Sequence, residues 1–184
     1  MRHKQVGQGD NRSYIFTPWR KYINPHTMNL QSVLILENIR SAQNVGAIFR
    51  TADAIGIKKI YLAGYTPAPL DKFNRPSKEI AKTALGAEKT IPWEGVPETA
   101  TLITRLQSEG YIVVAVEQTK NSLDYKKFEL LEQTAFIFGN EVDGILPETL
   151  RRSDEIIEIP MRGLKESLNV ATTAGIILFR ALDK

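Results

Sequence analysis

The sequence contains no cysteine among its 184 residues. This absence excludes disulfide bonds, thiolate catalysis and any zinc site with cysteine ligands. It fits a reducing compartment, and we expect a cytoplasmic protein. No apolar run approaches the roughly 18 residues that cross a bilayer, and the polar start MRHKQVGQGD does not resemble a signal peptide. We therefore expect no membrane partner.

Histidine is almost as scarce, since the only two, His3 and His26, both lie near the N-terminus. A histidine-based catalytic triad or metal site is therefore not expected, and we predict no metal ion. The chain also lacks both the G-x-G-x-x-G and the G-x-x-x-x-G-K-[ST] motif, which argues against a standard dinucleotide fold and a P-loop. Any chemistry must come from other polar side chains.

The first 30 residues form a basic and aromatic extension. Residues 1–22 carry five cations and one acid, interleaved with Tyr14, Phe16, Trp19 and Tyr22. Cations neutralise phosphates and aromatic rings stack on bases, so this pattern suits single-stranded nucleic acid. The alternative is a terminal segment whose aromatic side chains pack on the domain. The formal net charge of +3 is compatible with RNA but does not identify an RNA-binding protein.

Residues 31–184 alternate between short apolar runs and helical patterns. The apolar runs predict strands, and the runs with helical spacing predict helices. We expect strands at residues 32–36, 59–63, 111–116, 135–138 and 156–159, and a brief extended piece at 91–93. We expect helices at residues 44–55, 77–84, 98–108 and 147–152, and an apolar helix after residues 167–170. This order predicts a single-domain α/β fold with a mostly parallel sheet. The last helix is apolar on nearly all sides, so we expect it to be buried in a core or a subunit interface.

Three polar loops follow expected strands, where parallel sheets bind ligands. In the first, Asn44 opens a helix and Arg50 lies six residues on; an N-cap with a solvated arginine is the simpler interpretation. The second, residues 138–144, has glycines that bracket two acids, and it could be an ordinary turn. In the third, residues 159–169, Ser167 or Asn169 could simply cap the last helix.

Taken together, the three loops resemble the motifs of the SpoU/TrmH family of the SPOUT superfamily, which are RNA ribose 2′-O-methyltransferases. The first motif is similar to Asn44-x-Gly46-x-x-x-Arg50-Thr51-x-Asp53-Ala54-x-Gly56. The second is similar to Phe138-Gly139-Asn140-Glu141-x-x-Gly144, and the third to Ile159-Pro160-Met161 with Ser167-Leu168-Asn169-Val170-Ala171. The motifs occur in the family's order from about Val33 to the end of the chain.

The resemblance implies a deep trefoil knot at the C-terminus and a homodimer that buries the apolar C-terminal helix. It implies S-adenosyl-L-methionine (AdoMet) as cofactor, held by Gly139, Ile159, Met161 and Leu168. It also implies a catalytic set made of Arg50, Asn44, Glu141, Ser167 and Asn169. In the family, the arginine of one subunit faces the AdoMet of the other.

An arginine is a poor base because of its high pKa, so anchoring a phosphate is the physically easier role for Arg50. The expected function is AdoMet-dependent 2′-O-methylation of a ribose in structured RNA, with tRNA favoured over rRNA. Unlike larger members, the sequence shows no separate N-terminal RNA-binding domain, and we expect residues 1–30 to supply part of the RNA contact. The alternatives are a non-catalytic RNA-binding SPOUT relative and an unrelated α/β small-molecule enzyme.

Overall fold

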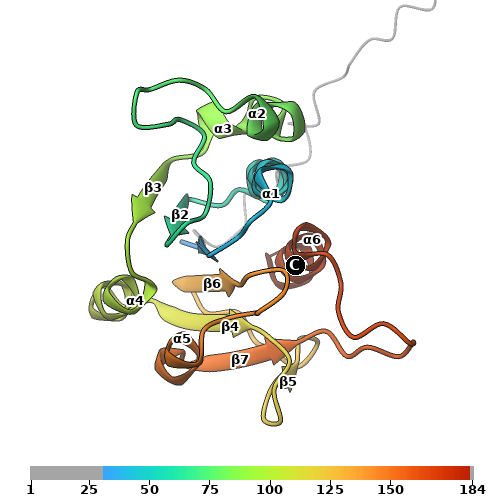
Figure 1. The fold of residues 1–184 in the computed structure, drawn as a ribbon. Helices are drawn as coiled ribbons and strands as arrows, with labels where there is room; N and C mark the ends of the chain where they lie inside the picture. Colours follow the sequence, from blue (N-terminus) through green and yellow to red (C-terminus); the bar gives the residue numbers. More distant parts are fainter. Residues whose placement is uncertain (1–30, 183–184) are drawn as a thin grey trace, which may run out of the picture.

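The computed structural model describes residues 31–182, so the basic and aromatic extension of residues 1–30 lies outside the described residues. Seven strands form one sheet in which every pair is parallel, in the order β3-β2-β1-β6-β4-β7-β5 (Figure 1). The strands are β1 Val33–Glu37, β2 Lys59–Ala63, β3 Trp93–Val96, β4 Ile112–Val116, β5 Leu123–Asp124, β6 Thr134–Phe138 and β7 Glu155–Glu158. The α/β fold predicted from the sequence is confirmed, with a sheet that is parallel throughout.

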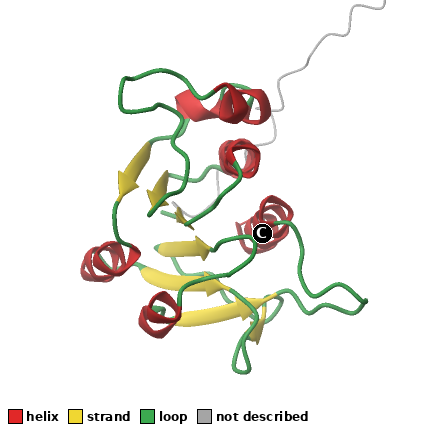
Figure 2. Cartoon of the chain, viewed as in Figure 1, coloured by secondary structure: helices red, strands yellow, loops and turns green. Residues whose placement is uncertain are grey.

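Helices cover both faces of the sheet (Figure 2). They are α1 Ala42–Ile55, α2 Lys78–Ala84, α3 Ala87–Thr90, α4 Thr99–Ser108, α5 Pro147–Arg152 and α6 Val170–Leu182. One apolar core lies between the sheet and helices α1, α2, α3 and α6. The other lies between the opposite face and α4, with α5 beside it. Because β1, β4 and β6 contribute alternate residues to the two cores, their side chains read as continuous apolar runs.

Helix α1 shows how the sequence sets a local boundary. Val45, Ile48 and Ala52 recur at helical spacing and are all buried, while Gly56 ends the helix with φ of 81°, as predicted. The predicted start at Asn44 was wrong. The helix begins at Ala42 because Ser41 Oγ accepts a hydrogen bond from the Asn44 backbone N–H at 3.2 Å, which makes Ser41 the N-cap.

The strand at residues 59–63 and the helix at residues 147–152 have the predicted bounds. The other predicted elements shift by one to three residues, and two short ones were missed. Helix α3 has four residues and β5 has two, so neither is long enough to show a period in the sequence. Helix α6 buries one side, including Ala174, Ile177 and Leu178, while Ile176 and Phe179 on its other side are exposed. Within residues 31–182, no helix is long and apolar enough to cross a membrane.

Gly46 allows α1 and α2 to approach closely. A Cβ atom at this position would overlap Thr83 Oγ1 and the backbone carbonyl oxygen of Ile80. We predict that Gly46→Ala lowers the free energy of unfolding by about 1–3 kcal/mol, because the two helices must separate. Urea denaturation monitored by circular dichroism measures this change. Gly95→Ala is the control, since a Cβ there meets nothing within 4 Å. Equal midpoints for the two variants would contradict the prediction.

Candidate functional site

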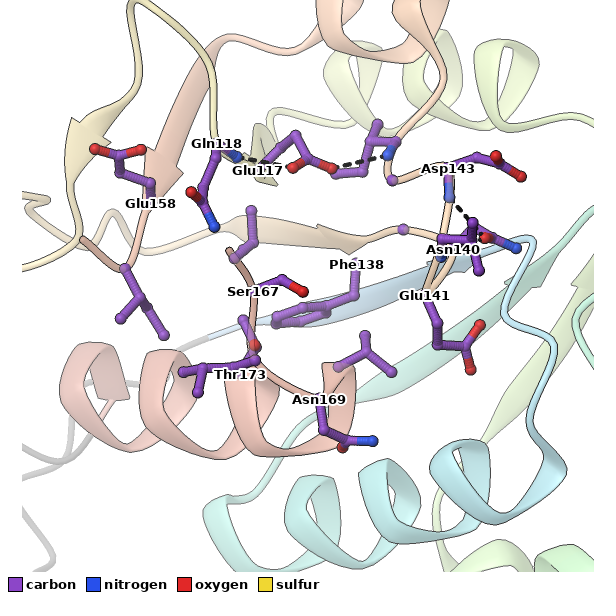
Figure 3. Close-up of a pocket in the computed structure, with 18 of the residues that line it drawn as sticks. Glu117, Gln118, Phe138, Asn140, Glu141, Asp143, Glu158, Ser167, Asn169 and Thr173 are labelled. Atoms are coloured by element: carbon purple, nitrogen blue, oxygen red, sulfur yellow. Dashed lines mark hydrogen bonds between the residues drawn. The ribbon is translucent and has the colours of Figure 1, made fainter. Parts of the chain in front are cut away.

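A cavity of about 610 Å³ opens at the edge of the sheet where β4, β6 and β7 end (Figure 3). Because the strands are parallel, the loops that follow their carboxyl ends meet there. The cavity is lined mainly by the loop after β4, the loop after β6 and the loop between β7 and α6. Seven predicted site residues line it: Gly139, Glu141, Ile159, Met161, Ser167, Leu168 and Asn169.

A chain of side-chain hydrogen bonds joins the three predicted motifs at the rim of this cavity. Asn44 Nδ2 donates to Glu141 Oε1 at 2.8 Å, and Asn169 Nδ2 donates to Asn44 Oδ1 at 3.0 Å. The Oδ1 atom of Asn169 accepts the backbone N–H groups of Ala171 and Thr172. Asn169 therefore caps α6, which was one of the two caps expected from the sequence. The same bonds fix the direction in which its amide points.

Glu141 also receives hydrogen bonds from the backbone. The N–H groups of Arg40 and Ser41 donate to its two carboxylate oxygens at 3.0 and 3.1 Å, at the start of α1. Partial burial favours the neutral acid, but the bonds from Arg40, Asn44 and Ser41 outweigh it, so the pKa of Glu141 lies below its usual value. Glu141 is therefore an oriented carboxylate at neutral pH.

Asn140 holds the loop between β6 and α5 in shape. Its side chain, of which 6% is exposed, donates from Nδ2 to Asn38 O and to Tyr65 Oη, both at 2.8 Å. Its Oδ1 atom accepts the backbone N–H groups of Val142 and Asp143. The Gly-Asn pair does form a turn, as its composition indicates. The turn is tied to the loops after β1 and β2 as well.

Gly139 is needed for packing inside the chain. A Cβ on Gly139 would lie 2.6 Å from the backbone of Gly144 and Ile145. The resemblance to the family implies that Gly139 holds the cofactor. The structure shows that the close approach includes the protein's own loop, although Gly139 also lines the cavity.

Sequence reasoning missed two residues after β4 and one at the end of β1. Glu117 Oε2 accepts the backbone N–H of Ile145 at 2.9 Å, and Gln118 Nε2 donates to Glu166 O at 2.7 Å. Glu37, which is buried, accepts the Leu146 N–H and the Thr149 hydroxyl. Each of them is a polar residue at or just after the carboxyl end of an apolar strand. The three predicted loops were recognised by the same feature, so it could have indicated these residues as well.

Arg50 does not lie in the cavity of its own chain. Arg50 lies six positions after Asn44, which corresponds to a rise of about 9 Å along α1. Its side chain is exposed and forms no hydrogen bond or ion pair with any residue of the described range 31–182. Among the predicted site residues, Arg50 is therefore the one that neither lines the cavity of its own chain nor bonds to a residue that does.

The cavity is acidic and partly apolar. Glu117, Glu141, Asp143 and Glu158 line it, and no lysine, arginine or histidine is among the described lining residues. Figure 3 shows these acids spread around the wall, and within residues 31–182 no group of acids and histidines has the arrangement of a metal site. Such a cavity suits an organic ligand that carries positive charge and an apolar part.

A parallel α/β sheet with a ligand-sized cavity at its carboxyl edge defines a small-molecule-binding α/β domain. The model of the SpoU rRNA Methylase family matches residues 31–179, so most of the chain is covered. The chain belongs to this family.

Two similar proteins are named for different classes of RNA, rRNA and tRNA. The 23S rRNA (guanosine-2′-O-)-methyltransferase RlmB of Neisseria meningitidis is 34% identical over 146 residues, which are 79% of this chain and 56% of the relative. The tRNA (guanosine(18)-2′-O)-methyltransferase of Thermus thermophilus is 31% identical over 148 residues, 80% of this chain and 72% of the relative. The chain thus spans little more than half the length of the rRNA relative.

A solved structure with the same fold is the AdoMet-bound rRNA methyltransferase from Sinorhizobium meliloti. It is 31% identical, with a TM-score of 0.74, and the match covers 82% of this chain and 55% of that one. The fold described above is thus shared with a protein crystallised with AdoMet.

The hydrogen bonds to Glu141 generate a prediction about pH. Glu141→Gln places an amide NH₂ against the N–H of Arg40 or Ser41, so we expect a loss on the order of 1 kcal/mol in unfolding free energy at pH 7. The folded pKa is lowered, so the carboxylate's contribution is present above the unfolded pKa, about 4.3, and is lost as pH falls through the folded pKa.

Urea denaturation of both proteins between pH 7 and pH 3 measures the difference. We expect the gap to be constant near neutrality and to close at the acid end. Glu129→Gln removes an exposed carboxylate that has no hydrogen bond within residues 31–182 and serves as control. A gap that does not narrow as the pH falls toward 3, or that is equal in the control, would contradict the assigned role.

Proposed function

We propose that this protein transfers a methyl group from AdoMet to a ribose 2′-hydroxyl in structured RNA. The observation that carries the proposal is the meeting of three separate motifs at one acidic cavity, joined by the bonds between Asn44, Glu141 and Asn169. The names of the relatives support it, since both are RNA 2′-O-methyltransferases.

The cavity fits the proposed cofactor. Its volume of about 610 Å³ is enough for a ligand of nucleoside size. Gly139, Ile159, Met161 and Leu168 would hold the adenosine part, and the carboxylates on the wall favour a positively charged ligand. AdoMet supplies a methyl group on a positively charged sulfur, which makes that carbon electrophilic. The protein must place the 2′-oxygen in line with it.

The polar residues divide this task. Glu141 and Asn169 hold Asn44 from two sides, so its amide is a fixed orienting group for the ribose. Ser167 lines the cavity and has an exposed hydroxyl that can bind the nucleotide. Arg50 is best suited to bind the phosphate next to the reacting ribose, because a guanidinium forms paired bonds with phosphate oxygens. The nearby positive charge then favours loss of the 2′-hydroxyl proton.

We propose that the active unit is a homodimer. Ile176 and Phe179 form an exposed apolar stripe on α6, with exposed fractions of 36% and 43%, which a second copy would cover. Arg50, unpaired within residues 31–182, would then face the cavity of the partner chain. The exposed stripe and the unpaired cation both support this arrangement.

We also propose that the C-terminal segment is knotted. After β7 the chain loops outward and returns as α6 beside α1 (Figure 1). In the sheet, β4 and β6 lie between β7 and β1, so the chain passes these two strands on its way to α1. On the way, Glu166 O is bound by Gln118 from the loop after β4. A threaded α6 is the family property that this path supports.

Between the two RNA classes we propose tRNA. The relative from Thermus thermophilus, 31% identical over 80% of this chain, is named for a tRNA substrate. Either substrate would place the protein in the cytoplasm.

The first prediction concerns the reaction. Labelled AdoMet incubated with separated tRNA and rRNA should yield labelled 2′-O-methylnucleoside in the tRNA pool. Arg50→Ala should lower the rate about 100-fold or more, because the phosphate anchor and the help in proton removal are both lost. Arg151→Ala, which removes an exposed arginine on α5, should leave the rate unchanged.

Label in rRNA alone would overturn the choice of tRNA. No label in either pool, with AdoMet bound in equilibrium dialysis, would favour a non-catalytic RNA-binding relative. No AdoMet binding at all would overturn the proposed cofactor and with it the proposed reaction.

The second prediction concerns the shared site. An Arg50→Ala chain and a Leu168→Trp chain, whose bulky side chain would block the cavity, are co-expressed with different tags and purified in tandem. Each dimer then holds one intact cavity facing one intact Arg50, so we expect about half the wild-type rate while each variant alone is inactive. An inactive mixed dimer would show that Arg50 does not act across the interface.

A further inference from the structure

The loop between β2 and α2, residues 64–77, is not used by the proposed reaction. It begins beside the cavity, where Tyr65 Oη accepts a hydrogen bond from Asn140 Nδ2 at 2.8 Å. From there it projects away from the body of the domain, next to α2 and α3 (Figure 1). Its tip, residues 71–76, is fully on the surface, since every residue in it is exposed.

Asp71 holds the tip of this loop in one shape. Its Oδ1 atom accepts the backbone N–H groups of Phe73 and Arg75, at 2.8 and 3.0 Å. Its Oδ2 atom accepts Arg75 Nε at 2.7 Å, and the backbone of Asp71 and Arg75 is paired as well. These bonds lower the pKa of Asp71, the backbone bond from Arg75 most of all. The loop is therefore exposed and yet ordered before any partner binds.

The ordered tip presents an aromatic ring close to two cations. Phe73 is 64% exposed, an unusual position for a large apolar side chain whose ring meets no core. The Lys72 ammonium lies 5.1 Å and the Arg75 guanidinium 4.9 Å from the ring centroid. Arg75 is held by Asp71, whereas Lys72 has no ion pair within residues 31–182. Lys72 can thus move aside while Arg75 stays.

We propose that the tip of the 64–77 loop binds an unpaired nucleotide of the RNA substrate. A base takes the place of Lys72 on the Phe73 ring, and the displaced ammonium binds a neighbouring phosphate. Arg75 offers its guanidinium plane and charge to the same nucleotide. This inference rests on the proposed function, since it assigns a second RNA contact to the protein that carries the cavity.

The position of the loop decides which part of the RNA it meets. Its first residues touch the turn that carries Glu141, through the bond between Tyr65 and Asn140. Its tip lies on the α2 side of the domain, away from α6 and the cavity loops (Figure 1). The loop therefore contacts a nucleotide that lies outside the methylated position. It selects substrates with an unpaired base at that distance.

The direct test uses a fluorescein-labelled single-stranded oligouridylate and, for comparison, a duplex of equal length. We expect Phe73→Leu to weaken binding of the single strand about five- to tenfold in fluorescence anisotropy, because leucine cannot stack. Phe73→Trp should keep the wild-type affinity or raise it. Neither variant should change binding of the duplex, whose bases are already stacked.

Charge is tested at Lys72. Lys72→Gln should reduce the slope of log affinity against log salt by about 0.7, the value for one phosphate contact on a single strand. Lys58→Gln is the matched control, an exposed lysine that precedes β2 at the opposite edge of the sheet. Circular dichroism and thermal unfolding verify that each variant is folded.

Turnover separates this proposal from the proposed function. With the RNA pool that wild type methylates, Phe73→Leu should raise KM about five- to tenfold and leave kcat and AdoMet affinity unchanged. The loop proposal is overturned if wild type and Phe73→Leu methylate RNA with the same KM. It is also overturned if Phe73→Leu and Phe73→Trp bind oligouridylate with the same affinity, or if Phe73→Leu alters the oligomeric state in sedimentation. If wild type methylates no RNA, the proposed function fails, while the oligouridylate series still decides whether the loop stacks on a base.

Discussion

The arrangement of the site depends on carboxylates that pair with backbone N–H groups at the carboxyl edge of the sheet. Glu37 and Glu117 accept such groups from the loop after β6, and Glu141, within that loop, accepts them from the loop after β1. A hydrogen bond to a charged acceptor is stronger than one to a neutral acceptor, so each carboxylate favours the loop conformation that brings these N–H groups to it. The Glu117 and Glu37 bonds fall on the successive residues Ile145 and Leu146, so they fix this part of the loop after β6.

The same carboxylates give the cavity its charge. Since the described wall carries four acids and no basic side chain, it is suited to a cationic ligand and repels phosphates. In the proposed reaction the cofactor and the RNA backbone therefore need separate surfaces. In this proposal the cavity would receive the cofactor, Arg50 of a second copy of the chain would bind the phosphate beside the ribose, and the 64–77 loop would hold a nucleotide farther away. Each of these contacts lies on a different element, so substrate choice and chemistry can be altered independently.

Most of the fold could be read from the sequence because each element has a short-range cause. Apolar runs such as residues 59–63 can be buried only as strands of a sheet covered on both faces, and Gly56 ends α1 as its backbone freedom allows. The failures have local causes too. Ser41 displaced Asn44 as the N-cap because either side chain could accept the first N–H groups. Short elements such as β5 are created by pairing with β7, and two residues carry no period of their own.

The sequence by itself determined the parallel α/β class, the strand ends that carry polar loops and the motifs that supply the chemistry. Only the tertiary structure decided which polar side chains meet. Asn44 bonds to Glu141, 97 residues away, and to Asn169, 125 residues away. It also showed that Arg50 lies outside the cavity of its own chain. The reason is that helix and strand patterns are local, whereas these contacts follow from the sheet order that sets β6 beside β1 and α6 beside α1, an order fixed by packing between distant segments.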